Sequence, residues 1–148
     1  MPIKTFRGNM SSGTQDTIVL HTNDGSVGYR IVKFQVFPSD PGTSNYETLF
    51  SIYKVSQSTI SVDTPAVNFA DNTLLATAYV EGASANTNTD TLHVVFDNEI
   101  FNQDIYITMT DTGGAGITSN YYIELEQIKL DLNENTVATL KDIRNIAG

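Results

Sequence analysis

Short runs of β-branched and aromatic residues, separated by turn-forming residues, set the strongest constraint on how this chain folds. The runs are built from Ile, Val, Tyr, Phe and Thr, and segments with the Ala, Leu, Glu and Lys composition of helices are nearly absent. Residues of the first kind suit a pleated, half-buried surface. We therefore expect one all-β domain over residues 1–148, an antiparallel, jelly-roll-like β-sandwich of about eight strands.

The strands are expected where apolar residues alternate between clusters of Gly, Pro, Asn and Asp. They cover residues 3–8, 17–22, 28–37, 46–57, 73–80, 91–96, 104–110 and 120–132, with a further short strand considered at 59–62. The turn residues at 23–26 predict a hairpin between the second and third of these strands. A polar, exposed loop is expected at 81–90, and a hairpin turn at 111–116.

Two of these strands have unusual patterns. The strand at 46–57 is apolar on both faces, which predicts a central or covered position in its sheet. In the last strand, odd positions are apolar up to Leu125 and even positions are apolar from Ile128. A β-bulge near Glu126 and Gln127 would restore the phase, and the alternative is that the chain crosses between sheets there.

The two ends of the chain are interpreted as arms, residues 1–10 and 133–148. Helical spacing of Val137 and Leu140 predicts a short C-terminal helix, and a strand through 136–144 is the alternative. Both ends mix apolar and cationic residues, as docking segments do. The alternative is that both ends pack on their own domain. The candidate interface residues are Ile3, Lys4, Phe6, Arg7, Leu140, Lys141, Ile143, Arg144 and Ile146.

Charge is distributed unevenly along the chain, which has a formal net charge of −9. Residues 55–128 contain ten acidic residues and no Lys or Arg, whereas residues 1–54 contain five basic residues and four acidic ones. Nucleic-acid binding is not expected, because it requires clustered Lys and Arg. The acidic stretch predicts a solvated surface, or one that contacts a basic partner or cations.

The amino-acid composition also excludes several kinds of chemical site. Without Cys there are no disulfides, thiol nucleophiles or cysteine-ligated metals. No apolar run suggests a membrane span, and the first residues have no apolar core of a signal peptide, so we expect folding in a reducing cytoplasm. We expect no cofactor.

No catalytic motif is visible, and we expect the protein not to be an enzyme. His21 and His93 are the only imidazoles, and each is interpreted as a surface or rim residue with a polar neighbour. No Ser has the G-x-S-x-G setting of a nucleophile elbow. The glycine cluster at 113–116 precedes no helix, which argues against a phosphate site.

Asp97, Glu99 and Asp104 are the candidate metal ligands, because carboxylates suit Ca²⁺. Their spacing does not match an EF-hand, and Asp97 with the following Asn is also ordinary turn chemistry. We therefore expect no metal site here, with these three residues as the alternative.

Four segments resemble short structural proteins of tailed phages that infect marine bacteria, of the cyanophage and pelagiphage type. They are MPIKTFRG, TNDGSVGYRIVKFQVFP, FDNEIFNQDIYIT and NYYIELEQIKLDLNENTVATLKDIRNI, within residues 1–8, 22–38, 96–108 and 120–146. The resemblance implies a virion structural protein made in the bacterial host cytoplasm. It implies no functional residue.

Together these features predict a non-enzymatic virion protein, with a capsid decoration or cement protein as the leading hypothesis. Its expected partners are the major capsid protein or other virion proteins, and a homo-oligomer is expected, with a trimer favoured. A structural protein of the tail, neck or fibre base is the first alternative. A carbohydrate- or calcium-binding β-sandwich module is the alternative of another class.

Overall fold

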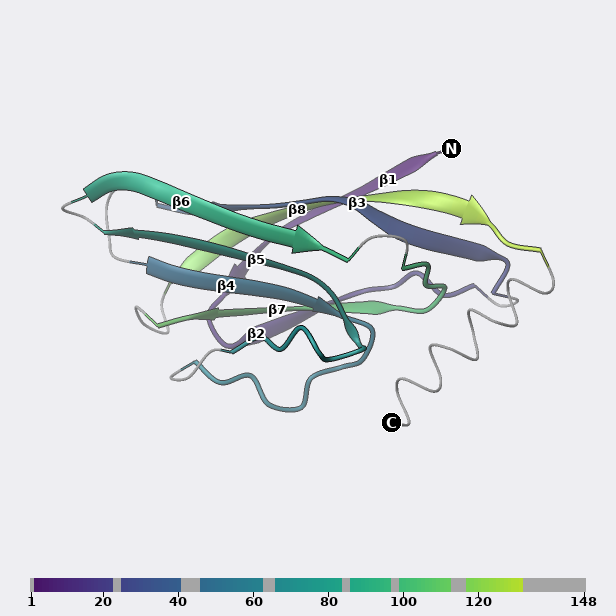
Figure 1. The fold of residues 1–148 in the computed structure, drawn as a ribbon, viewed down its shortest axis with the longest axis horizontal. Coiled ribbons are helices and arrows are strands. Elements are labelled where there is room, and N and C mark those ends of the chain that lie inside the picture. The colour runs from purple at the N-terminus through teal and green to yellow at the C-terminus, as the bar shows by residue number, and fades with distance from the viewer. Residues whose placement is uncertain are drawn as a thin grey trace.

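The computed structural model describes residues 2–22, 25–40, 46–62, 66–83, 86–96, 99–112 and 117–131 (Figure 1). Within these residues the chain forms eight strands and no helix, as the alternation of the sequence predicts. The strands are β1 (Ile3–Ser11), β2 (Thr14–Ile18), β3 (Val27–Pro38), β4 (Tyr46–Tyr53), β5 (Leu74–Ala83), β6 (Asn86–Val95), β7 (Ile105–Asp111) and β8 (Thr118–Lys129).

The strands form two antiparallel sheets that pack face to face (Figure 1). One sheet has the order β1-β8-β3, and the other has the order β2-β7-β4-β5-β6. In a jelly roll, a long hairpin is rolled up so that strands 1 and 8, 2 and 7, 3 and 6, and 4 and 5 lie together. Here β1–β8, β2–β7 and β4–β5 are hydrogen-bonded pairs, and β3 contacts β6. The expected jelly-roll-like β-sandwich is confirmed.

The core lies between the sheets, and aromatic rings from both sheets contact each other within it. Phe50 on β4 is fully buried, and its ring lies 6.4 Å from the ring of Phe34 on β3 and 6.2 Å from the ring of Tyr121 on β8. Ile107 and Ile123 are also fully buried, one from each sheet. Aromatic contacts at these distances add to the stability that burial gives.

β4 has the covered, central position that its two apolar faces predict. It lies between β5 and β7, and its inner face contributes Phe50 and Ile52 to the core. Its outer face is covered by the segment that follows it, residues 54–73, of which 54–62 and 66–73 are described (Figure 1). The short strand considered at 59–62 does not form, because these residues lie across the sheet as cover.

The expected β-bulge near Glu126 and Gln127 is wrong. The extra residue lies in the neighbouring strand: Ile31 pairs with Leu125 and Lys33 pairs with Glu124, which leaves Val32 as the bulge. β8 itself runs in unbroken register with β1 and stays in one sheet, so the alternative of a crossing is also wrong. Leu130 is buried because it follows the end of the strand, where the chain is free of strand alternation.

The expected hairpin between 17–22 and 28–37 is also wrong. β2 pairs with β7 and β3 pairs with β8, so the chain crosses from one sheet to the other in this connection. The same holds for the turn at 111–116, because β7 and β8 are in different sheets. Turn residues mark where a strand stops, and burial of the apolar faces decides which strand it joins.

The polar loop expected at 81–90 is instead largely strand. β5 extends to Ala83 and β6 begins at Asn86, and the two strands pair with each other. Backbone pairing along a long ribbon thus outweighs the low strand preference of its small polar residues.

The expected N-terminal arm is part of a sheet, since residues 3–10 lie in β1 and pair with β8 along their whole length. On the other side of this sheet, β3 is an edge strand, and Tyr29 forms an isolated bridge with Phe101. Residues 133–148, where the C-terminal arm and its helix or strand were expected, lie outside the described residues.

Candidate interaction surfaces

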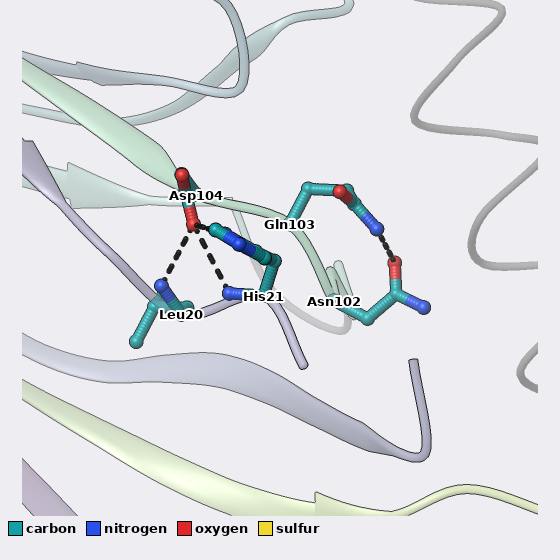
Figure 2. A network of polar contacts seen from close by, with 5 residues as sticks. All are labelled: Leu20, His21, Asn102, Gln103 and Asp104. Carbon is teal, nitrogen blue, oxygen red and sulfur yellow. Dashed lines mark hydrogen bonds and ion pairs between the residues drawn. The ribbon is translucent and has the colours of Figure 1, made fainter. Parts of the chain in front are cut away.

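His21 and Asp104 meet where β2 ends and β7 begins (Figure 2). One carboxylate oxygen of Asp104 accepts hydrogen bonds from the backbone N–H of Leu20 at 2.8 Å and of His21 at 3.0 Å. The same oxygen lies 2.7 Å from Nδ1 of His21. Burial alone would raise the pKa of Asp104, but these hydrogen bonds from His21 and Leu20 outweigh it, and the pKa is lowered.

This pair anchors the chain as it leaves β2. The other two side chains in the same view, Asn102 and Gln103, bond to each other, and Asn102 also donates to the carbonyl of Gly25 at 3.2 Å (Figure 2). The ring of His21 has the exposure and the polar neighbour expected from the sequence. These contacts hold two connections against the end of the sandwich.

The candidate metal ligands do not converge in the described residues. Glu99 forms an ion pair with Lys54, whose side chain is only 2% exposed, and Asp104 bonds to His21. Across the ranges that the structure describes, no group of three or more His, Cys, Asp or Glu side chains could hold a metal ion. Asp97 lies outside those ranges.

His93 lies on β6 beside an open groove of about 400 Å³. The groove is lined by Gln35, Val36, Phe37, His93, Asn120, Tyr121 and Tyr122, which include no carboxylate. His93 alternates with Leu92 and Val94, as expected, but the apolar side of this strand is exposed, with Leu92 at 67%. The groove therefore pairs an exposed imidazole with the rings of Phe37 and Tyr122 at the open edge of the sandwich.

The candidate interface residues of β1 divide between its two faces. Ile3 and Arg7 are exposed on the outer face of the three-stranded sheet, opposite Glu126 and Tyr122 of β8. Phe6 packs against the core, and the Lys4 ammonium lies 5.9 Å from the centre of the Tyr29 ring. The other candidates, Leu140, Lys141, Ile143, Arg144 and Ile146, lie outside the described residues.

The two sheets carry opposite charge. Five of the six Lys and Arg that the structure describes lie on the three-stranded sheet, namely Lys4, Arg7, Arg30, Lys33 and Lys129. Only two acids, Glu124 and Glu126, share that sheet, so its formal charge is +3. The five-stranded sheet carries Asp16, Glu47, Glu81, Asp90 and Asp111 without any Lys or Arg, a formal charge of −5.

The outer face of the three-stranded sheet is an ordered row of polar and aromatic side chains. Arg30 forms an ion pair with Glu126, and Lys33 lies 3.9 Å from Glu124. Tyr122 donates to Glu124 at 2.8 Å. Its neighbour Arg7 makes no ion pair within the described part of the chain. This face therefore offers a cation and an aromatic ring side by side.

The outer face of the five-stranded sheet carries two neighbouring carboxylates near the start of β4. Glu47 and Glu81 are directly opposite each other on β4 and β5. Burial, the hydrogen bond to Glu81 and the surrounding carboxylates raise the pKa of Tyr79 to about 12. Like charges directly opposite each other in a sheet are unfavourable unless something offsets them.

No protein-family model matches this chain, and no curated protein is similar enough to it to count as a match. In the described residues, no helix is long and apolar enough to cross a membrane.

Proposed function

We propose that this chain is a non-enzymatic structural protein of a tailed-phage particle, acting as a capsid decoration or cement protein through its outer surfaces. The observation that carries the proposal is the separation of charge between the two sheets, +3 on one and −5 on the other. Of these charged residues, Arg7, Arg30 and Lys33 face outward on the three-stranded sheet beside Glu124 and Glu126, and Glu47 and Glu81 face outward on the five-stranded sheet. Such a sandwich can bind an acidic surface by one face and repel it by the other.

The docking face in this proposal is the outer face of the three-stranded sheet. It presents Arg7, Tyr122 and Phe37, and Phe37 is 64% exposed. Arg and aromatic residues are enriched at protein interfaces, and the flat strands give them a fixed spacing. The matching partner has an acidic, partly apolar surface, such as a capsid protein or the five-stranded sheet of a second copy.

Two further points support an assembly role. The four segments that resemble marine-phage structural proteins contain all of β3 and most of β1 and β8, the strands of the proposed docking face. His21 and Asp104 hold two connections together, and the described residues contain no group of three or more His, Cys, Asp or Glu side chains that could hold a metal ion. A homo-oligomer, with a trimer favoured, is part of the proposal.

The test is to add purified protein to heads and tails separated from particles of a tailed marine phage, and to measure co-sedimentation. Size-exclusion chromatography with light scattering gives the oligomeric state in parallel. Binding to heads supports the decoration role, and binding to tails alone supports the tail, neck or fibre-base alternative instead. A monomer that sediments with neither component contradicts the proposal.

A further inference from the structure

A cavity of about 200 Å³ lies between the outer face of the five-stranded sheet and the segment that covers it. Its floor is formed by Leu49 and Ser51 on β4 and by Thr108 and Thr110 on β7. Leu49 pairs with Thr110 and Ser51 pairs with Thr108, so the four side chains form a block on adjacent strands. The other lining residues are Tyr53, Gln57, Thr59, Ile60, Ser61 and Ala66.

The cover is fixed to the sheet by specific hydrogen bonds. Gln15 on β2 donates from Nε2 to the hydroxyl of Ser56 at 3.0 Å, and its Oε1 accepts from the backbone N–H of Gln57 at 2.8 Å. Val62 lies 3.1 Å from the position that a Cβ would take at Gly13. The cavity is therefore bounded by two layers that are held together, and it is not a gap under a loose loop.

The hydroxyl of Thr110 has no hydrogen-bond partner. Thr110 is only 7% exposed, and its Oγ1 is buried and makes no hydrogen bond. A buried polar group without a partner is unfavourable, and most such groups are satisfied by water or a ligand. By contrast, the buried Thr77 on β5 donates to the carbonyl of Phe50 at 2.9 Å. Thr110 therefore differs from Thr77 in lining a cavity with its hydroxyl unused.

The lining has one chemical character, which identifies the kind of ligand that fits. Five aliphatic hydroxyls, one phenol and one amide line the cavity together with Leu49, Ile60 and Ala66, and no side chain of the lining is charged. Burial raises the pKa of Tyr53, so its phenol keeps its proton at neutral pH. An ion would find no counter-charge here, and a purely apolar molecule would leave the hydroxyls without partners.

We propose that this cavity binds one neutral sugar residue, with the Thr110 hydroxyl as a direct hydrogen-bond partner. A sugar ring has hydroxyls for the polar lining and C–H groups for Leu49 and Ile60. At roughly 30 Å³ for each water, the cavity has the volume of about seven waters, which suits a single ring. The sugar can be a free monosaccharide or the terminal residue of a glycan. This inference does not depend on the proposed virion role.

The test is a titration of the full chain with neutral hexoses and N-acetylhexosamines, and with oligosaccharides that end in the same sugars, followed by calorimetry. Binding of the free sugars identifies a monosaccharide site, and binding of the oligosaccharides alone identifies a glycan terminus; either supports the proposal. Thr110→Val removes only the hydroxyl, and we expect it to raise the Kd about tenfold. Thr118→Val, at a half-buried threonine on the three-stranded sheet whose hydroxyl donates to Ser39 at 2.9 Å, should leave the Kd unchanged.

A second variant keeps the test independent of hydrogen bonding. Ala66→Phe adds a ring at the rim of the cavity, where Ala66 is exposed, and binding should be lost while the thermal unfolding temperature stays close to that of the parent chain. The proposal is overturned if none of the neutral sugars binds and water alone occupies the cavity. It is also overturned if Thr110→Val binds sugar as tightly as the parent chain, or if a charged sugar binds more tightly than its neutral counterpart.

Discussion

Glu99 forms an ion pair with Lys54, a cation whose side chain is almost completely buried where β4 ends. Lys54 also donates its backbone N–H to the carbonyl of Thr73 at 2.8 Å, so this point joins three segments. A buried ammonium group is tolerated in a protein only when carboxylates or other acceptors surround it. Glu99, a candidate metal ligand in the sequence, thus neutralises the buried charge of Lys54.

Removing the charge of Glu99 should therefore destabilise the protein. We expect Glu99→Gln to lower the free energy of unfolding by about 1–3 kcal/mol, as measured by urea denaturation. Glu124→Gln is the matched control, because Glu124 is about as exposed as Glu99 but pairs with the half-exposed Lys33. Its cost should be about 0–1 kcal/mol. Equal losses for the two variants would contradict the assignment of Lys54 as a buried cation.

Asp104 gives the protein a defined response to acid. Its pKa is lowered in the folded state, so its contribution to stability is complete above the pKa of the unfolded chain, about 3.9 for Asp. The contribution is lost as the pH falls through the folded-state value. We expect Asp104→Asn to be less stable than the parent chain at pH 7, and the difference to shrink below about pH 4. A difference that stays constant from neutral to acid pH would show that the carboxylate charge has no role.

Tyr121 makes stability depend on pH at the alkaline end. Burial and the neighbouring carboxylate of Asp16, which accepts a hydrogen bond from the phenol at 3.3 Å, raise its pKa to about 12. Because its pKa is raised in the folded state, the contribution of Tyr121 to stability is complete below about pH 10 and is lost as the pH rises towards 12. We expect Tyr121→Phe to reduce this loss. Tyrosinate absorbance should show one fewer late-titrating group in the variant, and an unchanged titration would contradict the expectation.

Gly82 lies directly opposite Tyr46, and the ring of Tyr46 covers it. A Cβ at this position would lie 2.5 Å from the ring, and Tyr46 is only 4% exposed, so the ring has little room to move. We expect Gly82→Ala to lower the free energy of unfolding by about 1–3 kcal/mol. Gly28→Ala is the control, because its Cβ would meet only the methyl ends of Ile100 and Leu130 at 3.0–3.2 Å. A larger loss for Gly28→Ala would contradict this ranking.

The strand content and the layered architecture follow from the sequence, because alternation of apolar residues is a local signal. The central, covered place of β4 follows in the same way from its two apolar faces. The pairing of the strands cannot be predicted from the sequence in this way. Turn residues such as Gly25 show where a strand ends, but they do not determine which strand the next one pairs with. The bulge is another case: the phase change in β8 appears in its sequence, but the extra residue is Val32 on β3.

The candidate sites can also be predicted from the sequence only in part. The lack of Lys and Arg over residues 55–128 predicts an acidic stretch, but the structure divides this stretch between the two sheets, since β5, β6 and β7 lie in one and β8 lies in the other. Thr108 and Thr110, in contrast, occupy the positions of an outward, solvated face in the strand pattern. Only the path of residues 54–62 and 66–73 across β4 and β7 buries them and creates the cavity. A covering segment of this kind has no periodicity that a sequence could reveal.

We propose that this protein acts through the outer face of its three-stranded sheet, where Arg7 and Lys33 lie. The most direct measurement is co-sedimentation of the double variant Arg7→Glu, Lys33→Glu with purified phage heads, beside the parent chain and the control Glu47→Lys, Glu81→Lys on the opposite sheet. We expect the parent chain and the control to sediment with the heads and the first variant to remain in solution while still folded. Loss of binding in the control alone, with the first variant bound as tightly as the parent chain, would contradict the account.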